Sequence, residues 1–246
     1  MVFAQYYEAL KITDNLYGFF WQGRGNNCNA YLFTDVLEGE RPHVIIDPGY
    51  IVNEFREPCF KQLTAAMKML DLDPQDTGLI LNTHAHPDHC AAGEMLTQNT
   101  VKTKPPLIAF AWEEYAFLRT LKEKASRAAG LFLEKLEPFF LLDEGSLNLG
   151  KITLQVLITP GHSPGGACFY WPEQKILFSG DVVFYGSVGR TDLPGGSLSQ
   201  LQESIERLSG LDVECLLPGH FTQYGAVIRG REKVIRNFQA IKMFFV

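Results

Sequence analysis

The sequence lacks any apolar run that approaches the roughly 18 residues needed to cross a membrane. Its first residues also lack a basic segment followed by a long apolar one, so no secretory signal peptide is expected. Cysteine is scarce: there are five, an odd number, and none are spaced as C-x-x-C. This pattern argues against a disulfide framework and favours a reducing compartment, so we expect a cytoplasmic protein with no membrane partner.

Basic residues are fewer than acidic ones. The chain has 22 Lys and Arg against 28 Asp and Glu, for a net charge of −6. An acidic balance argues against nucleic-acid binding, which needs clustered basic residues. The 246 residues are enough for one large α/β domain with a buried core and a little short for two. We therefore expect residues 1–246 to form a single domain.

Histidine is rare as well, but its placement is ordered. Five of the six histidines lie in three short motifs, and an aspartate stands between the last two. The motifs are His84-Ala85-His86-Pro87-Asp88-His89, Gly161-His162 and Pro218-Gly219-His220, with Asp181 in Ser179-Gly180-Asp181. Neutral imidazole is the commonest metal ligand, and a carboxylate is its natural partner. The pattern predicts a two-metal hydrolytic site.

The apolar pattern places these motifs in loops at the ends of strands, a usual location for active sites. Strands are expected at 16–21, 29–34, 44–47, 77–82, 152–158, 167–171, 175–179 and 213–217. Helices are expected at 54–70, 198–208 and 229–245. Ser197 is expected to cap the second helix and Gly210 to end it.

The ordered ligand set resembles the metallo-β-lactamase superfamily over nearly the whole chain. The resemblance implies an α/β fold, a four-layer αββα sandwich with two mixed sheets inside and helices outside. It also implies two divalent metal ions, zinc first, with iron or manganese as alternatives. Its ligands would be His84, His86 and His162 for one ion, Asp88, His89 and His220 for the other, and Asp181 as a bridge. The matching Asp47 would orient ligands without binding metal.

The resemblance implies hydrolysis by a hydroxide held between the metals. The metals would lower the pKa of their bound water to about 7, so that it ionises near neutral pH. Asp88 would transfer a proton to the leaving group as well as bind metal, and Asp181 would hold both ions. A thiol has a pKa near 8.5, so a thiolate needs little help from a proton donor when it leaves. Small thioesters therefore suit this site.

Residues 184–196, with the core Gly189-Arg190-Thr191-Asp192, are similar to glyoxalase II-like thioesterases and to persulfide dioxygenases. The expected function is hydrolysis of a thioester of the hydroxyacylglutathione type. The alternative is a mononuclear iron persulfide dioxygenase that uses His84, His162 and Asp181; a lactonase is a weaker one. Arg190 is expected to pair with Asp192 rather than bind a substrate carboxylate. Only 26 residues follow His220, so the glutathione contacts of the C-terminal domain of glyoxalase II are not carried over.

A stretch at about 111–140 has helical apolar spacing and is predicted to be a helical insertion. Its stripe is Trp112, Tyr115, Leu118, Leu121, Ala125, Ala128, Phe132, Leu136 and Phe139, with a break or bend at Gly130. Three roles are open for it: a lid over the site, a homodimer contact or an extra core helix. Elsewhere, His43 is expected to be a solvated loop residue and Cys90 a small buried one.

Overall fold

The computed structural model describes residues 2–4, 6–98, 104–125 and 136–245. Eight strands form one sheet in chain order, antiparallel as far as β5 and parallel from there to β8. They are β1 (Val2–Ala4), β2 (Tyr7–Thr13), β3 (Leu16–Trp21), β4 (Ala30–Phe33), β5 (His43–Ile46), β6 (Thr77–Leu81), β7 (Leu107–Ala111) and β8 (Phe140–Leu142).

Six strands form the second sheet, in the order β16-β15-β12-β11-β10-β9. They are β9 (Gly145–Asn148), β10 (Thr153–Ile158), β11 (Ala167–Trp171), β12 (Ile176–Gly180), β15 (Cys215–Pro218) and β16 (Ile228–Arg229). Only the β12–β15 pair is parallel within this sheet. A separate hairpin of β13 (Val183–Phe184) and β14 (Ser187–Val188) follows β12.

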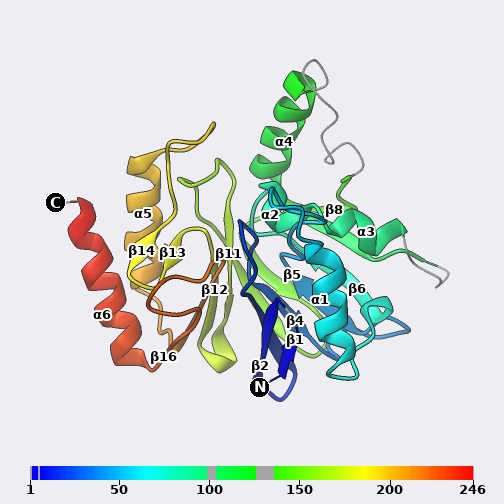
Figure 1. Ribbon diagram of the computed structural model, residues 1–246. Coiled ribbons are helices and arrows are strands. Elements are labelled where there is room, and N and C mark those ends of the chain that lie inside the picture. The colour runs from blue at the N-terminus through cyan, green and yellow to red at the C-terminus, as the bar shows by residue number, and fades with distance from the viewer. Residues whose placement is uncertain (1, 5, 99–103, 126–135, 246) are drawn as a thin grey trace.

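Helices cover the outer face of each sheet (Figure 1). The first sheet carries α1 (Cys59–Lys68), α2 (Pro87–Cys90), α3 (Gly93–Gln98) and α4 (Trp112–Ala125). The second carries α5 (Leu198–Ser209) and α6 (Arg231–Lys242). Single turns of 3₁₀ helix lie at η1 (Pro74–Asp76), η2 (Pro172–Gln174) and η3 (Met243–Phe245). The predicted four-layer αββα sandwich is confirmed.

The inner faces of the two sheets share one apolar core. Phe33 of β4 packs against Trp171 and Phe178 of the second sheet, with ring centroids 5.3 and 5.5 Å apart. Strands β4 and β5 are buried at every residue, because helices cover the face that does not meet the other sheet. Burial on both faces gives the site a rigid base.

Several boundaries differ from the sequence prediction. The strands at 16–21 and 167–171 have the predicted ends, and Ser197 caps α5 by accepting a hydrogen bond from the Gln200 backbone nitrogen. The helix expected from residue 54 begins only at Cys59, because Pro58 disfavours helical backbone in the residue before it. The helix expected at 229–245 is α6 alone, preceded by a strand at Arg229 and followed by η3.

The helix predicted at 111–140 does not include either end of that stretch. Ala111 belongs to β7, the described part of α4 is Trp112–Ala125, and Phe140 begins β8. Leu136 and Phe139 are not helical, and Phe139 is 74% exposed, so the predicted stripe is wrong at its end. Ala128, Gly130 and Phe132 lie outside the described residues. Within α4, Leu118 is buried in the core while Trp112 is exposed.

The prediction for His43 was wrong. His43 is 5% exposed and begins the buried strand β5, where its Nδ1 accepts a hydrogen bond from the Asp35 backbone nitrogen at 3.2 Å. Polar neighbours at 40–42 made the segment resemble a solvated loop. All five cysteines, Cys90 included, are buried and free, which confirms the absence of a disulfide framework. Among the described helices, none is long and apolar enough to span a bilayer.

Candidate metal centre

All seven predicted ligands come together at one end of the sandwich. His84 and His86 follow β6, and Asp88 and His89 lie in the short helix α2 that comes next. The second sheet supplies the other three, each from a segment that follows a strand: His162 after β10, Asp181 after β12 and His220 after β15. The ligand set is therefore assembled across the two sheets.

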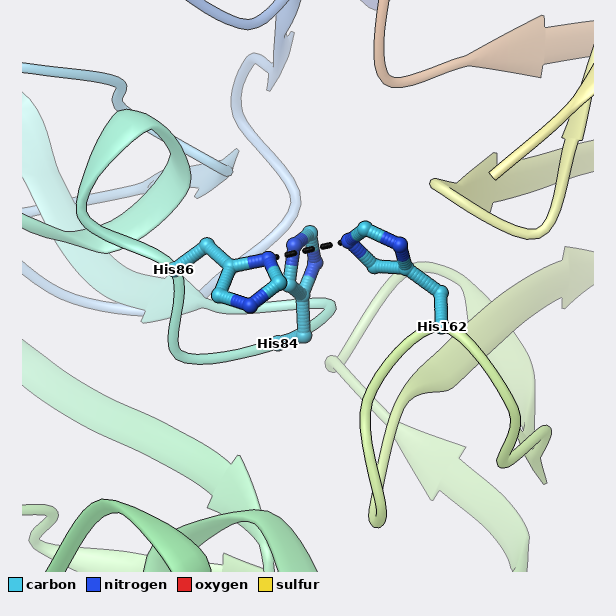
Figure 2. A group of neighbouring side chains, drawn as sticks. All are labelled: His84, His86 and His162. Atoms are coloured by element: carbon cyan, nitrogen blue, oxygen red, sulfur yellow. Dashed lines mark hydrogen bonds between the residues drawn. The ribbon is translucent and has the colours of Figure 1, made fainter. Parts of the chain in front are cut away.

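Three histidines form the first group (Figure 2). His84 and His86 project from one loop, and His162 faces them from another. His162 Nε2 lies 2.9 Å from His86 Nδ1, and one nitrogen from each ring fits within 4.8 Å of the others. His84 Nε2 is buried and has no hydrogen-bond partner. A buried nitrogen without a partner costs free energy, and a metal ion at this point would satisfy it.

A second group lies against the first. Asp88, His89 and His220 also place one ligand atom each within 4.8 Å of the others. Asp181 lies between the two groups: its Oδ1 is 3.2 Å from His89 Nε2, and its Oδ2 is 3.4 Å from His220 Nε2 and 3.5 Å from His162 Nε2. One carboxylate thus reaches histidines of both groups, as expected of a bridging ligand.

Asp47 is hydrogen-bonded to His89 and, through Thr83, is linked to His84, and it is not among the residues that line the cleft. Its Oδ2 accepts a hydrogen bond from His89 Nδ1 at 2.9 Å and another from the Thr83 hydroxyl at 2.6 Å. That hydroxyl in turn lies 3.0 Å from His84 Nδ1. Because Thr83 donates its proton to the carboxylate, it can only accept from His84. Both imidazoles therefore carry their proton on Nδ1 and present Nε2 to the site.

We expect Asp47→Asn to weaken metal binding by about 10- to 100-fold, the usual cost of losing a partner behind a ligating histidine. Asp47 uses both oxygens, because its Oδ1 also accepts a hydrogen bond from the Thr83 backbone nitrogen at 2.8 Å. Asparagine has one acceptor oxygen, so its NH2 group must face either that donor or the donors at Oδ2. Competition with a chromogenic chelator measures the affinity. Asp14→Asn, at an exposed carboxylate in the β2–β3 turn, is the matched control. Equal affinities in the two variants would contradict this role of Asp47.

The loop after β14 holds His162 in place. The Arg190 backbone carbonyl accepts a hydrogen bond from His162 Nδ1 at 2.7 Å. His162 Nε2 is then the nitrogen available to bind a metal ion. The Arg190 guanidinium makes a bidentate pair with Asp192, with both N–O distances 2.7 Å. That pair is exposed, and it holds the pKa of Asp192 at about 2 through the hydrogen bonds from Arg190. The predicted ion pair is present, in the loop whose Arg190 carbonyl contacts His162.

Arg190→Ala should lower the melting temperature slightly and leave KM unchanged, since the guanidinium is already occupied by Asp192 and solvated surface pairs contribute little. Thermal unfolding and steady-state kinetics measure the two effects. A raised KM with unchanged stability would instead show that Arg190 binds substrate.

The electrostatics of the cluster favour a cation. Burial, aided by the neighbouring His162, lowers the pKa of His86 to about 4, so this ring is neutral and can ligate at pH 7. Burial opposes ionisation of Asp88, yet the hydrogen bond and charge of His220 and the charge of His89 outweigh it and lower the Asp88 pKa to about 2. Burial likewise opposes protonation of His220, yet Asp181 raises its pKa to about 9. The carboxylates Asp88 and Asp181 thus stabilise positive charge at this point, which a metal ion would supply once it displaces the proton of His220.

A cleft of about 630 Å³ opens over the cluster. Its floor includes His86, Asp88, His162, Asp181 and His220. Its other lining residues are the mainly apolar Tyr50, Pro87, Phe184, Val188, Leu193 and Phe221, together with the polar Asn26, Arg190 and Thr222. Phe184 and Val188 belong to the β13–β14 hairpin, so the stretch at 184–196 singled out in the sequence lines the cleft. The cleft can hold a small molecule over the ligands.

Two residues of the site were missed in the sequence. The Asn26 amide nitrogen lies 2.5 Å from Asp88 Oδ2 and donates to it, and Asn26 also lines the cleft. Glu114, in α4, contacts the backbone of both ligand loops. Asn26 stands in a turn rich in glycine and asparagine, and Glu114 follows another glutamate. Neither setting carries a signal that separates a site residue from a solvated one.

Comparisons with known proteins agree with this geometry. The family model described as the Metallo-beta-lactamase superfamily matches residues 23–220. The chain is 30% identical to the acyl-coenzyme A thioesterase MBLAC2 of Gallus gallus, over 85% of this chain and 79% of that protein. It is 30% identical to the hydroxyacylglutathione hydrolase GloC of Haemophilus influenzae, over 84% and 89% respectively.

Among solved structures, TTHA1623 in a di-iron-bound form is similar to this chain with a TM-score of 0.60 and 34% identity. The match covers 79% of this chain and 88% of that one. The family match spans all seven ligand-type residues, which this fold brings to one point. On these grounds, the chain belongs to the metallo-beta-lactamase superfamily.

Proposed function

We propose that this protein is a binuclear metallohydrolase that cleaves a small-molecule thioester. The observation that carries the proposal is the convergence of two ligand groups and a bridging carboxylate on the floor of one open cleft. His84, His86 and His162 would hold one ion, Asp88, His89 and His220 the other, and Asp181 both. Zinc is the metal best suited to this histidine-rich set, and iron or manganese would also fit.

Bound ions supply two things in such a site: a water acidic enough to act as a nucleophile near pH 7, and polarisation of the substrate carbonyl. The chain's own residues do the rest. Asp47 and the Arg190 carbonyl keep histidine Nε2 atoms aimed at the site. Asn26 holds the Asp88 carboxylate at the cleft floor, where it is placed to carry a proton to the leaving group. This proton matters little for a thiolate, whose pKa is near 8.5.

Support for a thioester comes from the cleft and from the relatives. The apolar walls formed by Phe184, Val188, Leu193 and Phe221 suit an acyl chain better than a highly charged group. Two relatives are named as thioester hydrolases, one for acyl-coenzyme A and one for hydroxyacylglutathione. The five free, buried cysteines are consistent with work in the reducing cytoplasm.

A persulfide dioxygenase with one iron is the second candidate. His162 Nε2 lies 3.5 Å from Asp181 Oδ2. His84 has a nitrogen within 4.8 Å of a ligand atom of His162 and of one of Asp181, so these three residues could form a two-histidine, one-carboxylate iron site. The solved relative in a di-iron form fits an iron-loaded site of this fold. The identity and number of bound metal ions, and the reaction catalysed, distinguish the hydrolase from the dioxygenase.

The deciding experiment is elemental analysis of protein purified without added metal, followed by activity assays. We expect about two ions per chain, as a two-metal hydrolytic site requires. We also expect hydrolysis of hydroxyacylglutathione or of a short acyl-coenzyme A. About one iron per chain, with oxygen uptake on a glutathione persulfide and no thioesterase activity, would overturn the hydrolase proposal.

A further inference from the structure

Glu114 is buried behind the metal centre and does not line the cleft. It stands in the first turn of α4, and only 1% of its surface is exposed. Its Oε1 accepts a hydrogen bond from the Ala85 backbone nitrogen at 2.8 Å, and its Oε2 accepts one from the Gly165 backbone nitrogen at 2.9 Å. Both oxygens of one buried carboxylate are thus used on main-chain donors.

The two donors lie in the two loops that form the three-histidine group. Ala85 stands between His84 and His86, after β6 of the first sheet. Gly165 follows His162 in the turn between β10 and β11 of the second sheet. Glu114 therefore ties together two loops that come from opposite halves of the sandwich. No other contact described for α4 does this with a side chain.

The close approach of α4 to the His162 loop is built into the sequence at Gly165. A Cβ at that position would collide with the backbone nitrogen of Glu114. Burying a carboxylate costs folding free energy unless its oxygens are hydrogen-bonded. A buried glutamate at this point therefore suggests a specific role. Burial raises the pKa of Glu114, while the two backbone donors oppose that shift.

We propose that Glu114 is a positioning residue that sets the spacing between the His84–His86 loop and the His162 loop, and with it the affinity and geometry of the three-histidine metal site. The inference rests on the proposed function, which assigns these histidines as ligands. It gives the start of α4 a role other than lid, dimer contact or core helix. The hydrogen bonds described for Glu114 go to Ala85 and Gly165, and none goes to Asp88, His89 or His220.

The test is cobalt(II) titration of wild type, Glu114→Gln and Glu114→Ala, followed by the visible absorption spectrum. Glutamine has nearly the same size, but its amide nitrogen cannot accept, so Ala85 or Gly165 loses its partner. Glu113→Gln is the matched control, because Glu113 is the exposed neighbour in the same turn. Circular dichroism of the metal-free proteins checks the fold, and the glutamine variant serves if the alanine variant does not fold.

We expect the cobalt ion in the three-histidine site to bind about 10- to 100-fold more weakly in Glu114→Gln, with a changed spectrum, while the other site keeps its affinity. Wild-type affinity and spectrum in Glu114→Gln would overturn the inference and leave the proposed function intact. Equal weakening of both sites would also overturn it, since that marks a general loss of structure. A wild-type protein that binds no cobalt would overturn the proposed function and this inference together.

Discussion

Replacing Asp181 with asparagine is expected to lower kcat/KM for thioester hydrolysis by about 10³-fold, because metal ions contribute several kcal/mol to such a reaction and each ~1.4 kcal/mol is tenfold. Asp181 reaches His89, His162 and His220 with its two oxygens. Asparagine keeps the shape but removes the charge and one oxygen ligand. Steady-state kinetics and metal analysis of the same preparation measure the effect.

The control for this variant is Asp212→Asn. Asp212 is an exposed carboxylate paired with Lys175 and Arg231, and it does not line the cleft. This change should leave kcat/KM and metal content at wild-type values. Asp181→Asn with two bound ions and wild-type kcat/KM would contradict the bridging role. Loss of metal without loss of activity would contradict the metallohydrolase mechanism itself.

Gly219→Ala is expected to abolish metal binding at the group containing His220 while the chain still folds. A Cβ on Gly219 would collide with Asp181 Oδ1, lie 2.8 Å from His89 Cε1 and lie 3.0 Å from the Gly180 carbonyl carbon. Overpacking of this kind costs about 1–3 kcal/mol of folding free energy. The added methyl also pushes apart residues that must meet at the metals, so activity should fall with metal content.

Gly210→Ala is the matched glycine control. Gly210 ends α5 with φ −81°, and a Cβ there would meet only the Arg207 carbonyl oxygen at 3.4 Å. Because alanine adopts this backbone without strain, stability should stay within about 1 kcal/mol of wild type, and metal binding should not change. Metal content and melting temperature are measured for Gly219→Ala and Gly210→Ala and compared. A Gly219→Ala protein with full metal content would show that the turn can move aside.

The Pro218-Gly219-His220 turn shows how a short motif depends on distant residues. The Asn29 side chain and the Tyr31 hydroxyl both donate to the Pro218 carbonyl, at 3.0 and 2.7 Å. The Asn29 backbone nitrogen donates to the Gly219 carbonyl at 2.6 Å. The turn before His220 is thus held by Tyr31 of strand β4 in the other sheet and by Asn29, which directly precedes that strand. No local pattern around residue 220 could reveal this.

Local information was enough for the ligand types and for eight of the sixteen described strands; those expected at 16–21, 29–34, 44–47, 77–82, 152–158, 167–171, 175–179 and 213–217 are present within about two residues of their predicted ends. The closely spaced His84, His86, Asp88 and His89 predict a metal site, because few side chain types bind metal. The addition of His162, Asp181 and His220 to that site is what the family resemblance implies. Alternation and buried apolar runs located strands such as 16–21 and 167–171, where side-chain period and turn residues agree. The arrangement of the strands in two packed sheets is what the family resemblance implies.

Tertiary structure alone decided the rest, since burial is a property of the folded chain. His43 and Glu114 both stand in polar surroundings in the sequence, yet each is buried because strands or loops from far along the chain cover it. Glu113 and Glu114 are adjacent and identical in type, but the helix turns one toward solvent and the other toward Ala85 and Gly165. The sequence determined which residues can bind metal. The packing of the two sheets determined which side chains hold those residues in place. It brings together residues that lie far apart in the sequence, and no local pattern predicts such contacts.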